Sequence, residues 1–219
     1  MKRSVPNLLL ATGNPAKVRE IRAVLAGLPL EVVSLADLPA VSEPAETGAT
    51  FAENARAKAL YYARATGRWA LADDSGLVVD ALGGLPGVHS ARYAADEVPP
   101  GSPRQAIDAA NNRKLLRELA GVSDEWRTAR FICHLAMADA RGVLLEATGA
   151  IEGRIGHRPA GENGFGYDPL FLLDELGKTT AELPSEQKNA ISHRGKATRQ
   201  FALKLRTWID ENLQFTIDN

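Results

Sequence analysis

The feature that constrains the fold most is a short apolar run that leads straight into a helical pattern. Leu8, Leu9 and Leu10 form the run, and Thr12-Gly13-Asn14 ends it before Pro15 opens an amphipathic repeat. A continuous apolar run of this length is typical of a strand buried on both faces, and proline is favoured in the first turn of a helix. Helices must cover such a strand, so this segment favours an α/β fold.

The alternation of strand and helix patterns continues along the chain. Strands are predicted over residues 30–34, 69–74, 77–82 and 170–173, with a hairpin over residues 128–138 and 143–152. Helices are predicted over residues 15–28, 50–65, 104–119 and 194–212, and Thr50-Phe51-Ala52-Glu53 has the form of a capping box. We expect an α/β protein with a mixed central sheet flanked by helices, forming one domain over residues 1–219.

The composition limits the partners and the location. The 26 Lys and Arg residues nearly balance 27 Asp and Glu residues, which argues against a broad surface for nucleic acid or membranes. The apolar run behind Lys2 and Arg3 is too short for a signal peptide, and no stretch approaches the roughly 20 apolar residues of a membrane span. The single cysteine, Cys133, excludes an intrachain disulfide and is expected to be an inert core thiol. We expect a cytoplasmic protein.

The turn from Thr12 to Lys17 has the features of an anion site. A strand-to-helix turn directs free N–H groups and the positive end of the helix at an anion. Gly13 permits a close approach of the backbone, and Lys17 lies one turn into the helix. The second glycine and the Lys-Ser/Thr pair of a Walker loop are missing. An ordinary turn with an asparagine cap and a surface lysine is the alternative explanation.

Two adjacent aspartates, Asp73 and Asp74, end the strand predicted over residues 69–74. Neighbouring strand residues point to opposite faces, so one carboxylate can face a binding site while the other braces the turn. Carboxylates in this position suit Mg²⁺, a hard ion that prefers oxygen ligands. The alternative is an Asx turn before Gly76. Ser75 lacks the Gly-x-Ser-x-Gly context of a hydrolase nucleophile.

Three polar residues lie in or just before the helix that begins at Thr50. Glu46 is a loop carboxylate that could complete a metal site beside Asp74. Asn54 and Lys58 are one turn apart and share a helix face. For these two residues we favour a solvated surface.

Two later segments carry groups suited to a nucleobase. Phe165 lies between two glycines, which leaves room for a base to stack on its ring. Ser192 is predicted to cap the last helix, which places His193 and Arg194 in its first turn, where cations oppose the helix dipole. Both side chains can donate hydrogen bonds to a carbonyl. The alternatives are an aromatic that fills the core and a capped helix with incidental surface charges.

Taken together, five segments resemble the inosine triphosphate pyrophosphatase family over residues 8–205: ATGNPAK, ETGATFAENARAKA, ADDSGLVVDALGGLPGVHSARY, GFGYDPLF and EQKNAISHRGKA. They occur in the family's order, which makes the resemblance specific. It implies an elongated two-lobed molecule with a central substrate cleft, and a homodimer. It also implies Mg²⁺-dependent hydrolysis of ITP, dITP and XTP to the monophosphate and pyrophosphate, which keeps them out of DNA and RNA.

The resemblance also implies a role for individual residues. Glu46 and Asp74 would hold Mg²⁺, and Asp74 would also be the catalytic residue. The substrate would contact Thr12, Gly13, Asn14, Pro15, Ala16, Lys17, Ser75, Phe165, Gly166, Tyr167, Asp168, Lys188, His193 and Arg194. The proline-rich segment 95–103 and the tail 214–219 depart from the family pattern, but neither contains a site residue.

Three other functions compete with this one. A related pyrophosphatase could act on pyrimidine nucleotides, although the Ser192-His193-Arg194 segment favours a purine. A nucleotide sensor could bind without hydrolysis, although both predicted metal carboxylates are present. A nucleic-acid-binding module fits least, because the chain has a near-neutral charge and lacks a basic stripe with interleaved aromatics.

Overall fold

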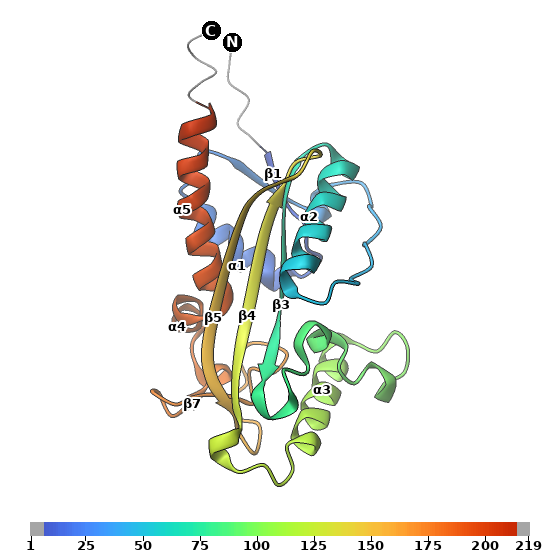
Figure 1. The fold of residues 1–219 in the computed structure, drawn as a ribbon, viewed down its shortest axis with the longest axis vertical. Helices are drawn as coiled ribbons and strands as arrows, with labels where there is room; N and C mark the ends of the chain where they lie inside the picture. Colours follow the sequence, from blue (N-terminus) through green and yellow to red (C-terminus); the bar gives the residue numbers. More distant parts are fainter. Residues whose placement is uncertain (1–6, 214–219) are drawn as a thin grey trace. The chain divides into compact units, whose positions relative to one another are not determined.

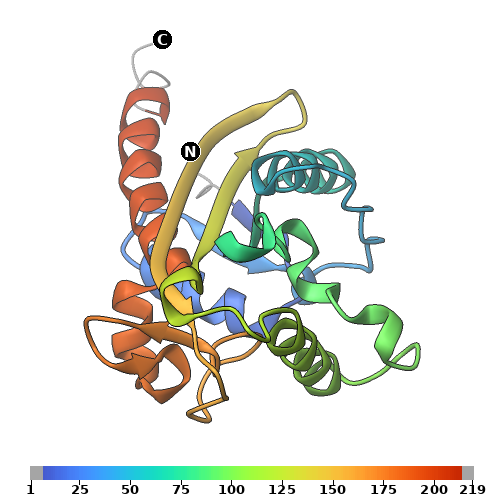
Figure 2. The ribbon, with the colours of Figure 1, turned by 60° about the horizontal axis from the view of Figure 1, so that its bottom comes forward.

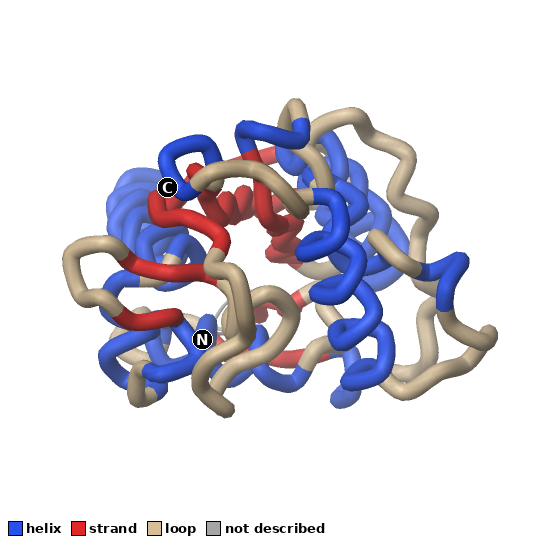
Figure 3. The backbone as a smooth tube through the Cα atoms, turned by 90° about the horizontal axis from the view of Figure 1, so that it is seen from below, coloured by secondary structure: helices blue, strands red, loops and turns tan. Residues whose placement is uncertain are grey.

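The computed structural model describes residues 7–213, so Lys2, Arg3 and the tail 214–219 lie outside the described residues. The fold is of the predicted class. A seven-stranded mixed sheet has the order β2-β1-β3-β4-β5-β6-β7 (Figure 1), and Figure 3 distinguishes the helices, strands and loops along the chain. The chain divides into two compact units. Unit 1 comprises Met1–Asp74, Cys133–Gly149 and Arg194–Asn219, and unit 2 comprises Ser75–Ile132 and Ala150–His193. The single domain stays a prediction.

In unit 1 the apolar run forms a buried parallel strand, as predicted. Strand β1 (Asn7–Leu10) pairs in parallel with β2 (Glu31–Ser34) and with β3 (Trp69–Val79), and its three leucines are fully buried. Strands β4 (Thr128–Ala138) and β5 (Val143–Ile155) form the predicted hairpin, with Asp139 and Gly142 at its turn. Strands β3, β4 and β5 each contribute residues to both units.

Helices cover both faces of the unit 1 strands. Helices α1 (Pro15–Leu25) and α5 (His193–Leu213) pack on the face that carries Leu8 and Leu10, whereas α2 (Phe51–Thr66) packs on the face that carries Leu9. Helix α5 lies alongside β5 (Figures 1 and 2), where Lys204 Nζ donates to the Glu146 carbonyl at 2.8 Å. The three leucine side chains of β1 are therefore buried, because both faces of the strand are covered.

The helix starts follow the predicted capping signals. Asn14 caps α1 and Pro15 is its first residue, and the Thr50 hydroxyl accepts from Glu53 N at 3.2 Å at the start of α2. The carboxylate of Glu53 accepts from Ala49 N, so only half of the predicted capping box forms in its usual way. Helix α1 ends three residues before the predicted end, at Leu25, because the glycine and proline that follow disfavour helix.

The predicted break at residues 75–76 is wrong. A single strand, β3, runs from Trp69 to Val79, and residues 80–82 form a short 3₁₀ turn instead of strand. Strand β3 lies between β1 and β4, and β4 is also 11 residues long. A long neighbouring strand can hold serine and glycine in extended conformation, whereas the local pattern suggests a turn. The two aspartates therefore lie within a strand and do not end it.

Unit 2 contains the predicted helix α3 (Arg104–Glu118) together with elements that the sequence pattern did not predict. These are helix α4 (Ser185–Ile191) and strand β7 (Lys178–Thr179), which pairs antiparallel with β6 (Phe171–Leu173). Their core includes Leu77, Leu115, Phe131, Phe171 and Leu183. Within residues 7–213 no helix combines the length and apolar character needed to cross a membrane.

Candidate active site

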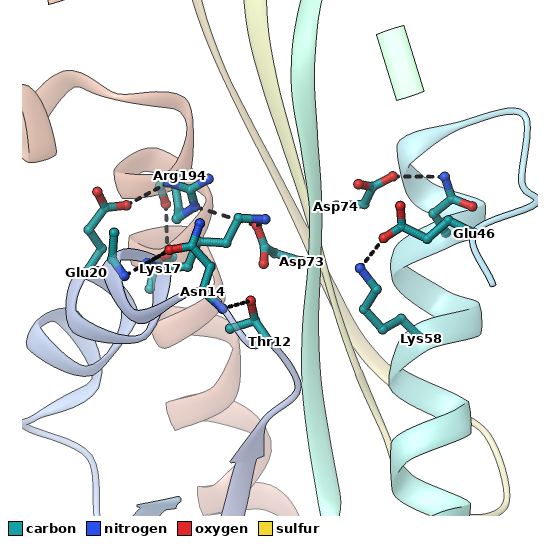
Figure 4. Close-up of polar contacts among 12 residues, drawn as sticks. Thr12, Asn14, Lys17, Glu20, Glu46, Lys58, Asp73, Asp74 and Arg194 are labelled. Carbon is teal, nitrogen blue, oxygen red and sulfur yellow. Dashed lines mark hydrogen bonds and ion pairs between the residues drawn. The ribbon is translucent and has the colours of Figure 1, made fainter. Parts of the chain in front are cut away.

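The two aspartates point to opposite faces of β3, as the period of a strand requires. Trp69 and Leu71 contact the cluster beneath α1 and α5, and Ala70 and Ala72 contact the cluster beneath α2. Figure 4 shows Asp73 on the α1 side of β3 and Asp74 on the α2 side. The pair therefore belongs to two separate polar clusters within unit 1.

The Asp74 cluster is organised by Asn54 at the start of α2. Asn54 Nδ2 donates to Asp74 Oδ2 at 3.0 Å, and Asn54 Oδ1 accepts from Gly48 N at 2.8 Å. One buried amide thus holds both the strand carboxylate and the loop that carries Glu46. Glu46 forms an ion pair with Lys58, one helical turn beyond Asn54 (Figure 4).

The electrostatics of this cluster suit a cation. Burial is the main cause that raises the pKa of Asp74, the nearby Glu46 carboxylate raises it further, and the hydrogen bond from Asn54 opposes the rise. A divalent ion beside Glu46 and Asp74 would compensate the two charges, and carboxylate oxygens are ligands that Mg²⁺ prefers. Among residues 7–213, no group of three or more His, Cys, Asp or Glu side chains gathers to hold a metal. Mg²⁺ usually keeps water and substrate phosphate oxygens as ligands, so two carboxylates fit it.

The Asp73 cluster is a buried ion network. Asp73 Oδ2 lies 2.8 Å from Lys17 Nζ and 3.6 Å from Arg194 Nε, and Arg194 Nη1 lies 2.7 Å from Glu20 Oε2. The side chain of Asp73 is fully buried. Burial by itself would raise the pKa of Asp73, but attraction to Lys17 and Arg194 outweighs it and holds the pKa well below its usual range.

The side chains of Thr12 and Asn14 in the glycine turn bind backbone N–H groups at the start of α1. Asn14 Oδ1 accepts from Ala16 N at 2.9 Å and from Lys17 N at 3.5 Å, and the Thr12 hydroxyl accepts from Asn14 N at 3.2 Å. A Cβ atom on Gly13 would meet open space. The turn therefore has the predicted cap, while its Lys17 ammonium is paired with Asp73. Phosphate binding by residues 12–17 stays a prediction.

In unit 2, Asp168 organises the glycine-rich loop. Its Oδ2 accepts from Phe165 N at 2.8 Å and lies 2.5 Å from Lys188 Nζ, and its Oδ1 accepts from the Thr180 hydroxyl at 2.9 Å. The Lys188 ammonium is also 5.1 Å from the centre of the Phe165 ring. Gly164 has a φ of +81°, and a Cβ there would lie 2.1 Å from Asp168 Oδ2. This loop accepts only glycine at position 164 without strain.

The remaining predicted residues lie beside the unit boundary in sequence. His193 is the first residue of α5, as predicted, and its ring stacks on Phe131 with centroids 4.9 Å apart. Asp74 of unit 1 precedes Ser75 of unit 2, and His193 of unit 2 precedes Arg194 of unit 1.

Three residues in these clusters were missed or misjudged from sequence. Asn54 is only 2% exposed and contacts Asp74, so the solvated surface that we favoured for it is wrong. Lys58 pairs with Glu46, 12 residues earlier, and Glu20 pairs with Arg194, 174 residues later. For Asn54 and Lys58 the sequence did offer a signal, because an amide and a lysine lie one turn apart on a helix that begins with a capping box. No local pattern links Glu20 to Arg194.

Comparisons with known proteins identify the family of this chain. Residues 8–204 match the model of the Ham1 family. The dITP/XTP pyrophosphatase of Geobacillus kaustophilus (strain HTA426) is 54% identical over 192 residues, covering 87% of this chain and 89% of the relative. The crystal structure of nucleoside-triphosphatase / dITP/XTP pyrophosphatase from Mycobacterium abscessus is 42% identical, has a TM-score of 0.72 and covers 91% of this chain and 98% of its own. A HAM1 protein from Coxiella burnetii is 38% identical with a TM-score of 0.80, covering 92% and 98% of the two chains. This chain belongs to the Ham1 family.

Proposed function

We propose that this protein hydrolyses ITP, dITP and XTP to the monophosphate and pyrophosphate. The observation that carries the proposal is the carboxylate pair Glu46 and Asp74, which Asn54 and Lys58 hold in place. The pair occurs in a chain 54% identical to a protein named dITP/XTP pyrophosphatase. Removal of these deaminated purine nucleotides would keep them out of DNA and RNA.

In unit 1 we assign the triphosphate to residues 12–17 and Mg²⁺ to Glu46 and Asp74. Mg²⁺, when bound, would supply positive charge to the phosphate oxygens and the leaving pyrophosphate. Asp74 positions the attacking water, since a carboxylate beside a cation is a weak base. Asn54 fixes the direction of the Asp74 carboxylate through the 3.0 Å hydrogen bond. Lys17 adds a positive charge at the start of α1.

We assign the base and sugar pocket to residues 165–168, the reading of the purine edge to His193 and Arg194, and further substrate contacts to Ser75 and Lys188. Inosine and xanthine carry a carbonyl at C6, where adenine carries an amino group. Donors aimed at that carbonyl are left unpaired against ATP, a mismatch that can reject a nucleotide by about 10⁴-fold. GTP shares the C6 carbonyl, so its rejection must depend on the 2-amino group.

The role of Arg194 needs a separate test, because its guanidinium also pairs with Glu20 and Asp73. If Arg194 reads the base, Arg194→Ala lowers the ratio of kcat/KM for ITP to kcat/KM for ATP. An unchanged ratio in a folded variant removes Arg194 from base recognition and leaves it a structural role. The melting temperature and far-UV circular dichroism of the variant establish that it is folded.

We also propose a homodimer, as the family resemblance implies, and a cytoplasmic location. A single buried cysteine is compatible with a reducing compartment. Light scattering coupled to size exclusion measures the mass in solution, and a monomer at micromolar concentration would contradict the dimer.

The deciding experiment measures pyrophosphate release with Mg²⁺ from ITP, XTP, dITP, GTP, ATP, dTTP and UTP. We expect release from the first three far above ATP and GTP, abolished by EDTA. Asp74→Asn should lose turnover and keep its fold, whereas Asp174→Asn, on an exposed ion pair, should remain active. Preference for dTTP or UTP would indicate a pyrimidine enzyme, and tight ITP binding without release would indicate a sensor. Wild-type activity in Asp74→Asn would refute its assignment.

A further inference from the structure

Helix α3 binds both backbone polar groups of a single residue in the glycine-rich loop. Asp108 and Asn112 are one turn apart on α3 and therefore share a face. Gly166 N donates to Asp108 Oδ2 at 3.0 Å, and Asn112 Nδ2 donates to the Gly166 carbonyl at 2.9 Å. The N–H and the C=O of Gly166 are thus each bound by a different side chain of the same helix.

The residues on either side of Gly166 are also fixed. Phe165 N donates to Asp168 Oδ2 at 2.8 Å, and the Tyr167 hydroxyl donates to the Ser90 carbonyl at 2.9 Å. Gly166 itself has a φ of +63°, a left-handed conformation that glycine adopts readily and that its peptide can leave as readily. Without the two α3 contacts, the backbone that carries Phe165 would lack a restraint at this glycine.

The carboxylate of Asp108 is itself held in place. Its second oxygen, Oδ1, lies 2.9 Å from Arg104 Nε, one turn earlier on α3, and the Asp108 side chain is only 13% exposed. Asp108 therefore presents a nearly buried, oriented acceptor to Gly166. A side chain that is oriented in advance loses little rotamer freedom when it holds the loop.

We propose that Asp108 and Asn112 are positioning residues that fix the Phe165 ring for the nucleobase and so set base affinity and selectivity. Neither residue needs to touch the substrate. The inference rests on the proposed function, because it takes Phe165 as the group on which the base stacks. The inference gives α3 a role in base selectivity. The unit 1 residues assigned to the triphosphate and the metal have no such role.

The test separates the base from the phosphates. Asn112→Ala and Asp108→Ala should each raise KM for ITP about tenfold, the loss expected for one hydrogen bond, while kcat changes less than about threefold. The ITP over ATP ratio of kcat/KM should fall. Inhibition by inorganic tripolyphosphate, which has no base, should be unchanged. Asp108→Asn keeps an acceptor oxygen and should recover most of the affinity.

A matched control and a measurement independent of turnover complete the design. Arg113→Ala alters the exposed residue that follows Asn112 on α3 and should leave KM unchanged. Amide hydrogen exchange in residues 164–167 should accelerate in the Asn112 and Asp108 variants and remain slow in Arg113→Ala.

The outcomes are distinguishable. Unaltered KM and exchange in both alanine variants, or equal weakening of ITP and tripolyphosphate, would overturn the positioning role while the proposed function stands. A wild-type protein that releases no pyrophosphate from any purine nucleotide would overturn the proposed function and the inference together.

Discussion

Replacing Asp73 by asparagine removes a buried negative charge on which Lys17 and Arg194 both converge. The Lys17 ammonium is 2.8 Å away and Arg194 Nε is 3.6 Å away. At an effective dielectric constant of about 20, each contact carries a gross attraction of roughly 5 kcal/mol, much of which offsets the desolvation of the ions. Loss of one partner of a buried pair costs about 3–5 kcal/mol, and we expect Asp73→Asn to lower the free energy of unfolding by that amount.

The size of this effect should depend on pH. Burial alone would raise the pKa of Asp73, but Lys17 and Arg194 hold it well below its usual range. A carboxyl whose pKa is depressed in the folded state contributes stability that is fully present above the unfolded pKa, about 3.9, and is lost as the pH falls through the folded pKa. The difference between wild type and variant should therefore be full at neutral pH and shrink below about pH 4.

Urea denaturation in EDTA, followed by far-UV circular dichroism, measures both quantities. The control is Asp174→Asn, which removes an exposed partner of Arg154, at 51% side-chain exposure. An exposed pair contributes about 1 kcal/mol or less, so this control should remain close to wild type. A loss below about 1 kcal/mol for Asp73→Asn at neutral pH, or the same loss at every pH, would refute the buried network as a source of stability.

Three further predictions follow from buried or strained groups. Arg127 donates to the carbonyls of Leu119, Ile155 and Gly156. Arg127→Met should therefore lower the free energy of unfolding, measured in urea, by about 3 kcal/mol. A loss near zero would show that these hydrogen bonds do not stabilise the fold. Gly164→Ala should reduce kcat/KM for ITP at least about tenfold, because a Cβ would displace Asp168; unaltered kinetics would contradict this. Burial raises the pKa of Cys133 to about 12, so a thiol reagent at mildly alkaline pH should label it only after unfolding in urea, and rapid labelling of the native protein would contradict the buried thiol.

The sequence alone determines much of the local structure. Leu8 to Leu10 form a fully buried strand because their uninterrupted apolar run has no polar face. Asn14 with Pro15 and Thr50 with Glu53 begin helices because capping depends on residues a few positions apart. The opposite directions of Asp73 and Asp74 follow from the period of a strand, whichever sheet contains it.

Only the tertiary structure decides what each aspartate meets. Which face of β3 receives α1 and α5, and which receives α2, depends on chain segments more than 100 residues apart. That choice gives Asp73 two cations in a closed network and gives Asp74 an amide and a second carboxylate. The continuity of β3 through Ser75 and Gly76 likewise depends on its neighbour β4, which no local pattern reveals.

The candidate base loop gives the same contrast between local pattern and long-range contact. Glycine is the residue that adopts positive φ most readily, and Gly164 and Gly166, on either side of Phe165, both have positive φ. The contacts that hold the turn come from Asp108 and Asn112, more than 50 residues earlier, and from Lys188, about 20 residues later. Sequence patterns record backbone preferences of neighbouring residues, whereas hydrogen bonds between distant side chains depend on packing, so the glycine conformations of this loop follow from local pattern and its distant partners do not.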